Sequence, residues 1–351
     1  MISFSPGPSQ VYPALPKYFQ EAYDHDILSA NHRSRVFMNM YQEVIQLFQE
    51  KLHLPTGYRL LFTSSATENW ETISQSLTKN GSYHLYSGSF GKKWFDYASH
   101  ILPKTEGNKF SADEGFSVSD LTIAEELDII AITQNETANA SQVPLEVIED
   151  IRSKFPNKLI AVDTTSSMAG IELDFQQADV WFASVQKCFG LPAGLGFLIL
   201  SPQAIERAHE IGEKGRYNSV SFMLENADNY QTHYTPNVLG IYLLKRLLKD
   251  IEEIQFTDKR IRGRMQELEN IVASKDKFRY LVKRPEFRSR TVLGILAEEQ
   301  LVEDIKKSAE KNGIILGSGY GGFKATSFRI ANFPVISDEQ FQKLTTFLKE
   351  Y

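Results

Sequence analysis

Short apolar segments alternate with amphipathic segments through the first two thirds of the chain, and this alternation limits the fold more than any other feature. The amphipathic segments space their apolar residues as helices do. Buried strands that alternate with such helices form a mostly parallel sheet covered on both faces, so we expect an α/β fold. The candidate strands are at 59–64, 82–88, 128–136, 158–170, 178–187 and 194–201.

The pattern changes after about residue 235, where two long helical segments precede a shorter run of strands and helices. This predicts a second, smaller α+β unit. We expect a large domain over residues 16–250 and a small domain over residues 251–351. An extended arm rich in proline and serine, residues 1–15, is expected to join the small domain.

The composition excludes several classes of protein. The 351 residues carry a net charge of −6, so no basic surface for nucleic acid or membrane is expected. One cysteine, Cys188, rules out an internal disulfide and a cysteine-based metal site, and no metal is expected. Because the start lacks the pattern of a secretory signal and no apolar run could span a bilayer, we expect a cytoplasmic protein.

Polar clusters follow five of the candidate strands. They read TSSATEN, SGSFG, TQNET, DTTSS and SVQK. Functional groups in parallel sheets gather beyond the carboxyl ends of the strands, so these clusters predict one shared crevice.

Two residues of this crevice point to a specific chemistry. Lys187 lies between two apolar segments, and a lysine deprived of water has a lowered pKa and a nucleophilic amine. Asp163 closes the strand LIAVD and needs a cationic partner if it is buried. A surface lysine and a turn-forming aspartate are the alternatives. An imine-forming lysine together with an acid for a pyridine nitrogen is what a protein contributes to pyridoxal phosphate chemistry.

Other segments fit the remaining parts of that cofactor and of a carboxylate substrate. SSATEN opens a helix after a strand and suits a phosphate, although a plain helix cap is the alternative. Phe90 can stack on a planar ring or belong to the core. Arg329, and the pair His32 and Arg33 in NHRS, are candidate clamps for anions, with solvated surface positions as the alternative.

Taken together, these motifs resemble the class V, fold-type I pyridoxal-phosphate aminotransferases, and most closely the phosphoserine aminotransferase group. The resemblance covers nearly the whole chain and keeps the order of the motifs FSPGPS, NHRS, GYRLLFTSSATEN, QNET, VDTTSS, SVQKCFGLPAGLG, TPN and FRIAN. It implies a large domain with a mostly parallel sheet flanked by helices, a smaller α+β domain and a homodimer with active sites at the interface.

The resemblance also implies a role for individual residues. Lys187 would bind pyridoxal 5'-phosphate covalently and then act as general base and acid, while Asp163 would keep the pyridine nitrogen protonated. Phe90 would stack on the ring and Thr137 would lie near its 3-oxygen. Residues implied to cradle the phosphate are Ala66, Thr67, Thr165 and Gln186, with Thr235 and Asn237 reaching the cofactor of a partner subunit.

Substrate recognition is implied in the same way. Arg329 would bind the substrate carboxylate, with His32 and Arg33 near the far end of the substrate, and Lys324 is a further candidate for a substrate phosphate. The expected reaction is ping-pong transfer of an amino group between L-glutamate and 3-phosphohydroxypyruvate, in serine biosynthesis.

Three alternatives stay open. The first is an alanine or serine aminotransferase acting with glyoxylate or pyruvate. The second is a cysteine desulfurase, which would have to use Cys188 beside the lysine. The third is a cofactor-binding protein without catalysis.

Overall fold

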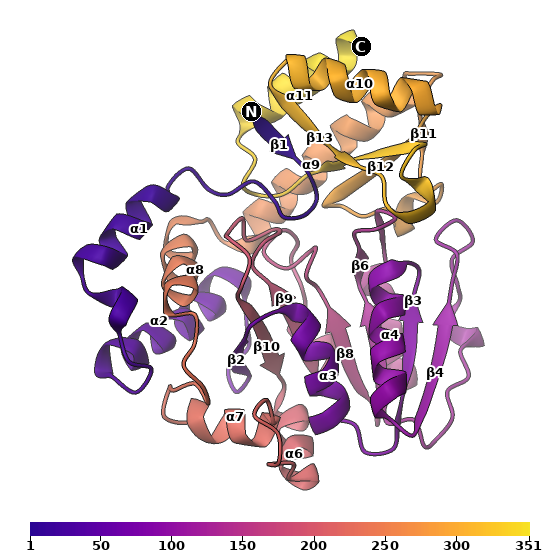
Figure 1. Cartoon of the computed structure of the whole chain (residues 1–351). Coiled ribbons are helices and arrows are strands. Elements are labelled where there is room, and N and C mark those ends of the chain that lie inside the picture. The colour runs from indigo at the N-terminus through magenta and orange to yellow at the C-terminus, as the bar shows by residue number, and fades with distance from the viewer.

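The computed structural model describes all 351 residues, and its larger part is built on a seven-stranded sheet (Figure 1). The strands lie in the order β2-β10-β9-β8-β5-β3-β4. Their bounds are β2 (Arg59–Thr63), β10 (Gly196–Leu200), β9 (Val180–Ser184), β8 (Leu159–Asp163), β5 (Ile129–Thr133), β3 (Gly81–Tyr86) and β4 (Lys104–Lys109).

The direction of the strands decides where the functional groups meet. All neighbouring strands of this sheet are parallel except for the two pairs that β10 makes, with β2 and with β9. Because β2 and β9 are both antiparallel to β10, they run in the same direction. The carboxyl ends of β2, β9, β8, β5 and β3 therefore all lie at the same end of the sheet. The polar segments that follow these strands can converge there.

Helices pack against both the sheet and each other. Figure 1 shows α3 (Ala66–Ser76) and α4 (Ser89–Ile101) across one face of the sheet. Helix α3 begins directly after β2 because Ser65 accepts a hydrogen bond from the Glu68 N–H at 3.1 Å and so caps the helix. The other helices of this part are α1 (Leu15–Asp24), α2 (Arg35–Leu52), α5 (Leu145–Lys154), α6 (Pro202–Ile211), α7 (Val220–Ala227) and α8 (Val238–Asp250).

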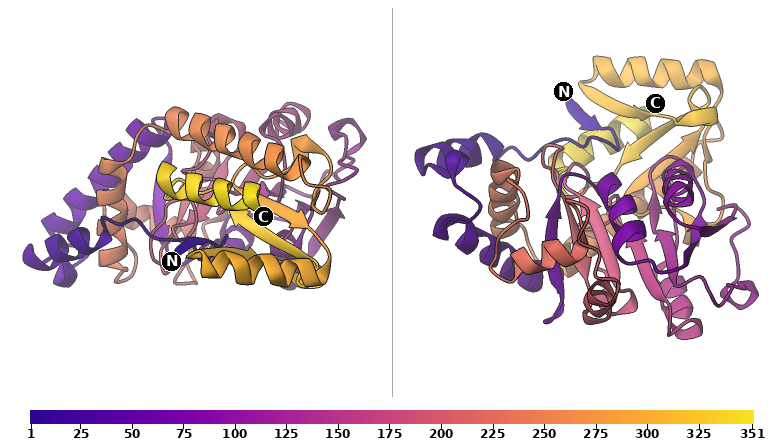
Figure 2. Two further views of the ribbon diagram at one scale, coloured as in Figure 1. Left: turned by 90° about the horizontal axis from the view of Figure 1, so that it is seen from above. Right: turned by 60° about the horizontal axis from the view of Figure 1, so that its bottom comes forward.

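A five-stranded sheet with its own helices lies over one end of the large sheet, as both views of Figure 2 show. Its strands follow the order β1-β13-β14-β12-β11. The strand bounds are β1 (Ile2–Phe4), β13 (Ile314–Ser318), β14 (Ser327–Ala331), β12 (Val292–Leu296) and β11 (Arg279–Tyr280), and the helices are α9 (Ile254–Ala273), α10 (Glu299–Lys311) and α11 (Asp338–Glu350).

The N-terminal arm connects the small sheet with the carboxyl end of the large sheet. Strand β1 pairs in parallel with β13, and the chain then crosses to α1 (Figure 2). On the way, the Ser9 N–H donates to the Gln186 carbonyl at 2.8 Å, which ties the arm to the segment after β9.

The α/β fold and the mostly parallel sheet are confirmed. Some details go beyond the expectation: the arm contributes a strand, β10 is the antiparallel member of the mostly parallel sheet, and α1, β4, α6 and α7 were not predicted. Strand β4 reads KTEGNK and carries no apolar alternation, since it is a partly exposed edge strand. The domain bounds stay a prediction, with the chain turning at 251–253 between α8 and α9. No helix has the length and apolar character that crossing a membrane requires.

Candidate active site

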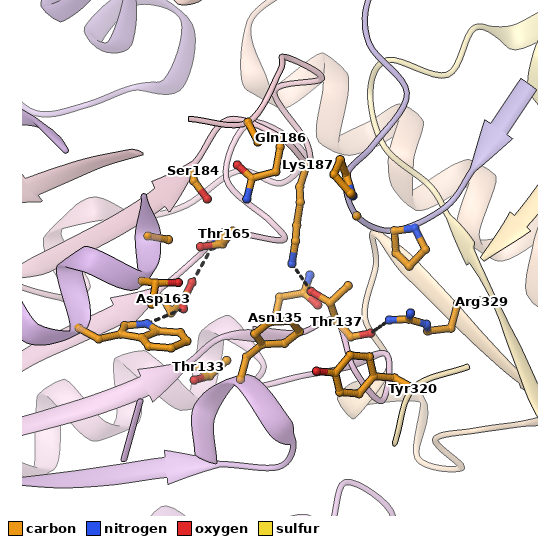
Figure 3. Close-up of a pocket in the computed structure, with 18 residues that line it drawn as sticks. Thr133, Asn135, Thr137, Asp163, Thr165, Ser184, Gln186, Lys187, Tyr320 and Arg329 are labelled. Atoms are coloured by element: carbon orange, nitrogen blue, oxygen red, sulfur yellow. Dashed lines mark hydrogen bonds between the residues drawn. The ribbon is translucent and has the colours of Figure 1, made fainter. Parts of the chain in front are cut away.

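A cavity of about 310 Å³ opens where the carboxyl ends of the large sheet meet the small sheet and the N-terminal arm (Figure 3). This volume lies at the lower end of the range for small-molecule sites. Lining residues from the predicted set are Ala66, Thr67, Phe90, Thr137, Asp163, Thr165, Gln186, Lys187 and Arg329. The polar clusters of five strands thus converge as the sequence predicts.

Lys187 follows β9 and extends into the middle of the cavity, between Asp163 and Arg329 (Figure 3). Its side chain is buried, and Nζ donates to the hydroxyls of Thr137 and Ser166, the latter at 2.8 Å. Burial lowers the pKa of the Lys187 amine, while the nearby carboxylates of Asp163 and Glu136 act in the opposite direction. A buried amine held only by hydroxyl groups is suited to act as a nucleophile.

Asp163 is the last residue of β8 and is also buried. One carboxylate oxygen accepts from the Thr165 N–H at 2.9 Å, and the other accepts from the indole N–H of Trp70 at 3.2 Å. Burial raises the pKa of Asp163, and these hydrogen bonds and the charge of Lys187 partly offset that effect. A cationic partner on the cavity side would complete the environment of this carboxylate.

Phe90 lies in the first turn of α4, and its ring is 5.1 Å from Lys187 Nζ. The turn is held by the buried carboxylate of Glu136, which belongs to the two-residue strand β6 (Asn135–Glu136). This carboxylate accepts from the N–H groups of Phe90 at 2.8 Å and Gly91 at 3.1 Å, and on its other oxygen from Ala138 at 3.0 Å. Glu136 therefore caps α4 from a distance and fixes the Phe90 backbone.

The N-terminus of α3 forms one end of the cavity. Ala66 and Thr67 belong to its first turn, whose N–H groups have no partners within the helix. Gln186 and Thr165 line the cavity beside them. Unpaired N–H groups and a helix dipole at one end of a cavity suit a phosphate group.

Arg329 lies at the opposite end, in β14 of the small sheet. Its Nε donates to the Ser318 carbonyl at 2.8 Å and one Nη to the Thr137 carbonyl at 2.6 Å. Both neighbours of Arg329 in the sheet register are glycines, Gly294 and Gly317, where a side chain would collide with Leu281 and with Pro6 of the arm. Since no carboxylate pairs with it, the guanidinium is free to bind an anion from the cavity.

The cavity wall fits pyridoxal phosphate in one further respect. The side-chain oxygens of Thr133 and Asn135 are buried in this wall and have no hydrogen-bond partner within the chain. Buried polar atoms are nearly always paired, so a polar ligand that fills the cavity would satisfy them. Together with Lys187, Asp163 and the α3 N-terminus, these atoms match a ligand with an aldehyde, a ring nitrogen and a phosphate.

Four predicted residues do not line the cavity. His32 and Arg33 lie on the turn between the short 3-10 helix at Ile27–Ser29 and α2, and Arg33 is exposed. Thr235 is exposed as well, and Asn237 caps α8 through its bond to the Gly240 N–H at 2.8 Å. Their predicted roles toward a partner subunit stay predictions.

Lys324 is exposed and lines a groove between α10 and β13, away from the cavity. Tyr320 from the same glycine-rich segment occupies the place beside Arg329, and its ring is 5.9 Å from that of Phe90. An aromatic residue between glycines, in GSGYGGFK, was the available signal for it. Trp70, Asn135 and the arm residues 6–8 also line the cavity and were not foreseen, because their partners are distant in sequence.

Cys188 faces away from the cavity. It is buried, and its thiol donates to the Ser166 carbonyl at 3.2 Å. Burial raises the pKa of this thiol, which disfavours the thiolate that a desulfurase requires. The desulfurase alternative therefore loses its only nucleophile.

Comparison with known proteins identifies the family of the chain. The model of the family "Aminotransferase class-V" matches residues 94–328. A phosphoserine aminotransferase from Rhodococcus opacus is 26% identical over 354 residues, covering 97% of this chain and 92% of that protein. A phosphoserine aminotransferase from Corynebacterium glutamicum is 27% identical, with 97% and 92% covered.

A solved structure is similar over almost the entire chain. The crystal structure of a phosphoserine aminotransferase from Cytophaga hutchinsonii superposes with a TM-score of 0.94 at 34% identity and covers 99% of this chain and 98% of that one. Because the family model spans more than half of the chain and this relative spans nearly all of it, the family is established. The chain belongs to the class V aminotransferases, and it is a pyridoxal-phosphate-dependent aminotransferase of fold type I.

Proposed function

We propose that the chain is a phosphoserine aminotransferase, which transfers an amino group between L-glutamate and 3-phosphohydroxypyruvate in a ping-pong reaction of serine biosynthesis. The observation that carries the proposal is the cavity in which Lys187, Asp163 and Arg329 converge. The curated relatives and the 34% identical structure, which bear this name, support the choice of substrates.

The residues of the cavity divide the work between them. Pyridoxal phosphate, when bound, supplies the electron-withdrawing ring that stabilises negative charge at the substrate Cα. Lys187 is the only amine in the cavity wall, so its Nζ would take the proton from the substrate Cα and deliver it to the aldehyde carbon of the cofactor, a 1,3-proton shift. Asp163 would hold the proton at the ring nitrogen, and Phe90 would pack on the face of the ring.

The remaining contacts orient the ligands. Thr67, Gln186, Thr165 and the N-terminus of α3 would bind the cofactor phosphate, and Thr137 would lie beside the ring oxygen. Arg329 would bind the substrate carboxylate in a bidentate pair. The arm residues 6–8 and Tyr320, which also line the cavity, would limit the access of water.

The far end of the substrate requires a second chain. Apart from Lys187, the cavity wall holds one cation, Arg329, whereas phosphoserine carries a carboxylate and a phosphate. We infer that His32 and Arg33 of a second copy bind the phosphate, and that Thr235 and Asn237 reach the cofactor of the other copy. The proposed assembly is a cytoplasmic homodimer.

Because Arg329 is the only cation besides Lys187 in the cavity wall, a second candidate function is also supported. A substrate with only one anionic group, such as alanine or serine with glyoxylate or pyruvate as acceptor, would be matched within one chain. The two candidates differ in whether a substrate phosphate contributes to binding.

A half-reaction distinguishes them. The purified holoenzyme is mixed separately with L-phosphoserine, L-glutamate, L-alanine and L-serine, and the absorbance of the lysine-bound cofactor is followed. Conversion with phosphoserine and glutamate but not alanine supports the proposal, and the reverse pattern supports the second candidate. In Arg329→Ala, we expect every amino acid that the wild type converts to react about 10- to 100-fold less efficiently, because one charge-assisted pair is lost. A loss confined to one substrate would contradict that role of Arg329.

A further inference from the structure

Trp70 contacts the proposed catalytic machinery although it has no place in the mechanism above. It lies on α3 and is 4% exposed, and its indole N–H donates to Asp163 Oδ2 at 3.2 Å. The other oxygen of Asp163 accepts from the Thr165 N–H at 2.9 Å. Each carboxylate oxygen thus holds one donor, and the two donors come from different elements of the fold.

The position of Trp70 along its helix gives this contact a structural meaning. Trp70 follows Ala66 by four residues. It therefore lies about one turn further along α3 than the N–H groups that are proposed to bind the cofactor phosphate. On its other side the indole packs against Tyr97 of α4, with ring centroids 5.9 Å apart. The ring is therefore held by both helices that cover this face of the sheet.

We propose that Trp70 is a positioning residue, whose indole N–H sets the orientation of the Asp163 carboxylate so that it receives the ring N–H of the cofactor. A carboxylate torsion has broad minima of its own, and a donor on each oxygen restricts it. A hydrogen bond to the charged form also stabilises that form against the cost of burial. The proposal rests on the proposed function, because it assumes that Asp163 pairs with the pyridine nitrogen.

The alternative is that Trp70 only fills space between α3, α4 and β8. The two readings assign importance to different parts of the side chain. Trp70→Phe keeps an aromatic ring but removes the N–H. Trp70→His removes the six-membered ring but can keep an N–H at the same position of a five-membered ring. Comparison of these two variants therefore separates packing from hydrogen bonding.

The test compares two ligands as well as two variants. Dissociation constants are measured by equilibrium dialysis for pyridoxal phosphate and for its 1-deaza analogue, in which a C–H replaces the ring nitrogen. The control is Trp181→Phe, which removes an equally buried indole N–H that donates to the carbonyls of Phe175 and Ala178 instead of Asp163. Thermal unfolding reports whether each variant folds.

In Trp70→Phe we expect the dissociation constant for pyridoxal phosphate to rise about tenfold and that for the analogue to rise less than about twofold. Only pyridoxal phosphate has a ring N–H that pairs with the ionised carboxylate. Trp70→His should keep the ratio of the two dissociation constants within about threefold of the wild-type value. In Trp181→Phe the ratio should not change.

An equal loss for both ligands in Trp70→Phe, or no loss for either, would overturn the proposal. If Trp70→Phe does not fold, Trp70→His, which retains the donor, provides the test. A change of more than about threefold in its ratio of the two dissociation constants would then overturn the proposal. Absence of lysine-bound cofactor in the wild type would instead refute the proposed function, so the two failures are distinguishable.

Discussion

The wall that faces the cofactor and the turn that carries His32 and Arg33 are built in different ways. In the wall, Asp163 ends β8 and Lys187 follows β9, both are buried, and each has hydrogen-bond partners on two segments of the chain. On the turn, Arg33 is exposed, and its backbone N–H bonds only to its neighbour Asn31, at 2.8 Å.

This difference indicates which part of the site one chain completes by itself. Groups that carry out chemistry must hold their geometry closely, and strands supported by a packed sheet provide that. An exposed turn outside the cavity cannot position a group for its own active site, but it is free to enter that of another copy. One chain thus provides the whole cofactor end, whereas binding of a substrate phosphate by His32 and Arg33 would, under the proposed function, require a second copy.

Replacement of Lys187 should produce the largest effect on the cofactor end. In Lys187→Ala we expect turnover to fall by at least about 10³-fold, because the general base and the covalent anchor are both lost. The absorbance of the lysine-bound cofactor should vanish, whereas dialysis should still detect the cofactor, since Asp163 and the α3 N-terminus are unchanged. Retained turnover would refute the role of Lys187.

Replacement of Arg33 should produce a smaller effect, limited to the phosphate end. In Arg33→Ala we expect the KM for phosphoserine to rise about 10- to 100-fold, as one charge-assisted contact to a phosphate is removed. Steady-state kinetics with phosphoserine measure this KM, and cofactor binding should be unaffected, because Arg33 does not line the cavity.

Hybrid dimers sharpen this comparison. Neither Arg33→Ala nor Lys187→Ala chains alone should act well on phosphoserine. When the two chains are mixed during refolding, a hybrid has one site with Lys187 from one chain and Arg33 from the other. Recovered activity supports a site shared between copies. Unrecovered activity in purified hybrids would show that Arg33 serves its own chain, contrary to the inference.

The wall and the turn also differ in how far the sequence alone predicts them. Lys187, Asp163 and Thr137 could be placed in one crevice because strand patterns and polar strand ends are local signals, and parallel strands bring those ends together. The antiparallel direction of β10 could not be predicted, because a short apolar run has no directional signal.

Contacts between distant segments account for the residues that sequence reasoning missed. Trp70 and its partner Asp163 are 93 positions apart. Trp70 reads as an ordinary apolar position of an amphipathic helix, and only the packed fold shows what its N–H reaches. For His32 and Arg33 even the folded chain is insufficient, because the expected partner is another molecule.

The smallest predicted effect concerns Glu136, which supports the wall without touching the expected ligands. In Glu136→Gln the amide group must face either the Ala138 N–H or those of Phe90 and Gly91, so at least one donor meets another donor. We expect the free energy of unfolding to fall by about 1–3 kcal/mol. We also expect kcat/KM to fall about tenfold, as the Phe90 turn loosens.

Asp128 offers a matched control at the opposite end of the sheet, where the strands β3 and β5 begin. Its carboxylate also binds backbone N–H groups, those of Lys79, Asn80 and Gly81 at 2.8–3.0 Å, at the start of β3 and remote from the cavity. Asp128→Asn should therefore lower stability, measured by urea unfolding, with unchanged kcat/KM. If both variants lose activity in proportion to stability, general loosening of the sheet explains the effect. If only Glu136→Gln loses activity, the precision of the cofactor wall depends on this buried cap.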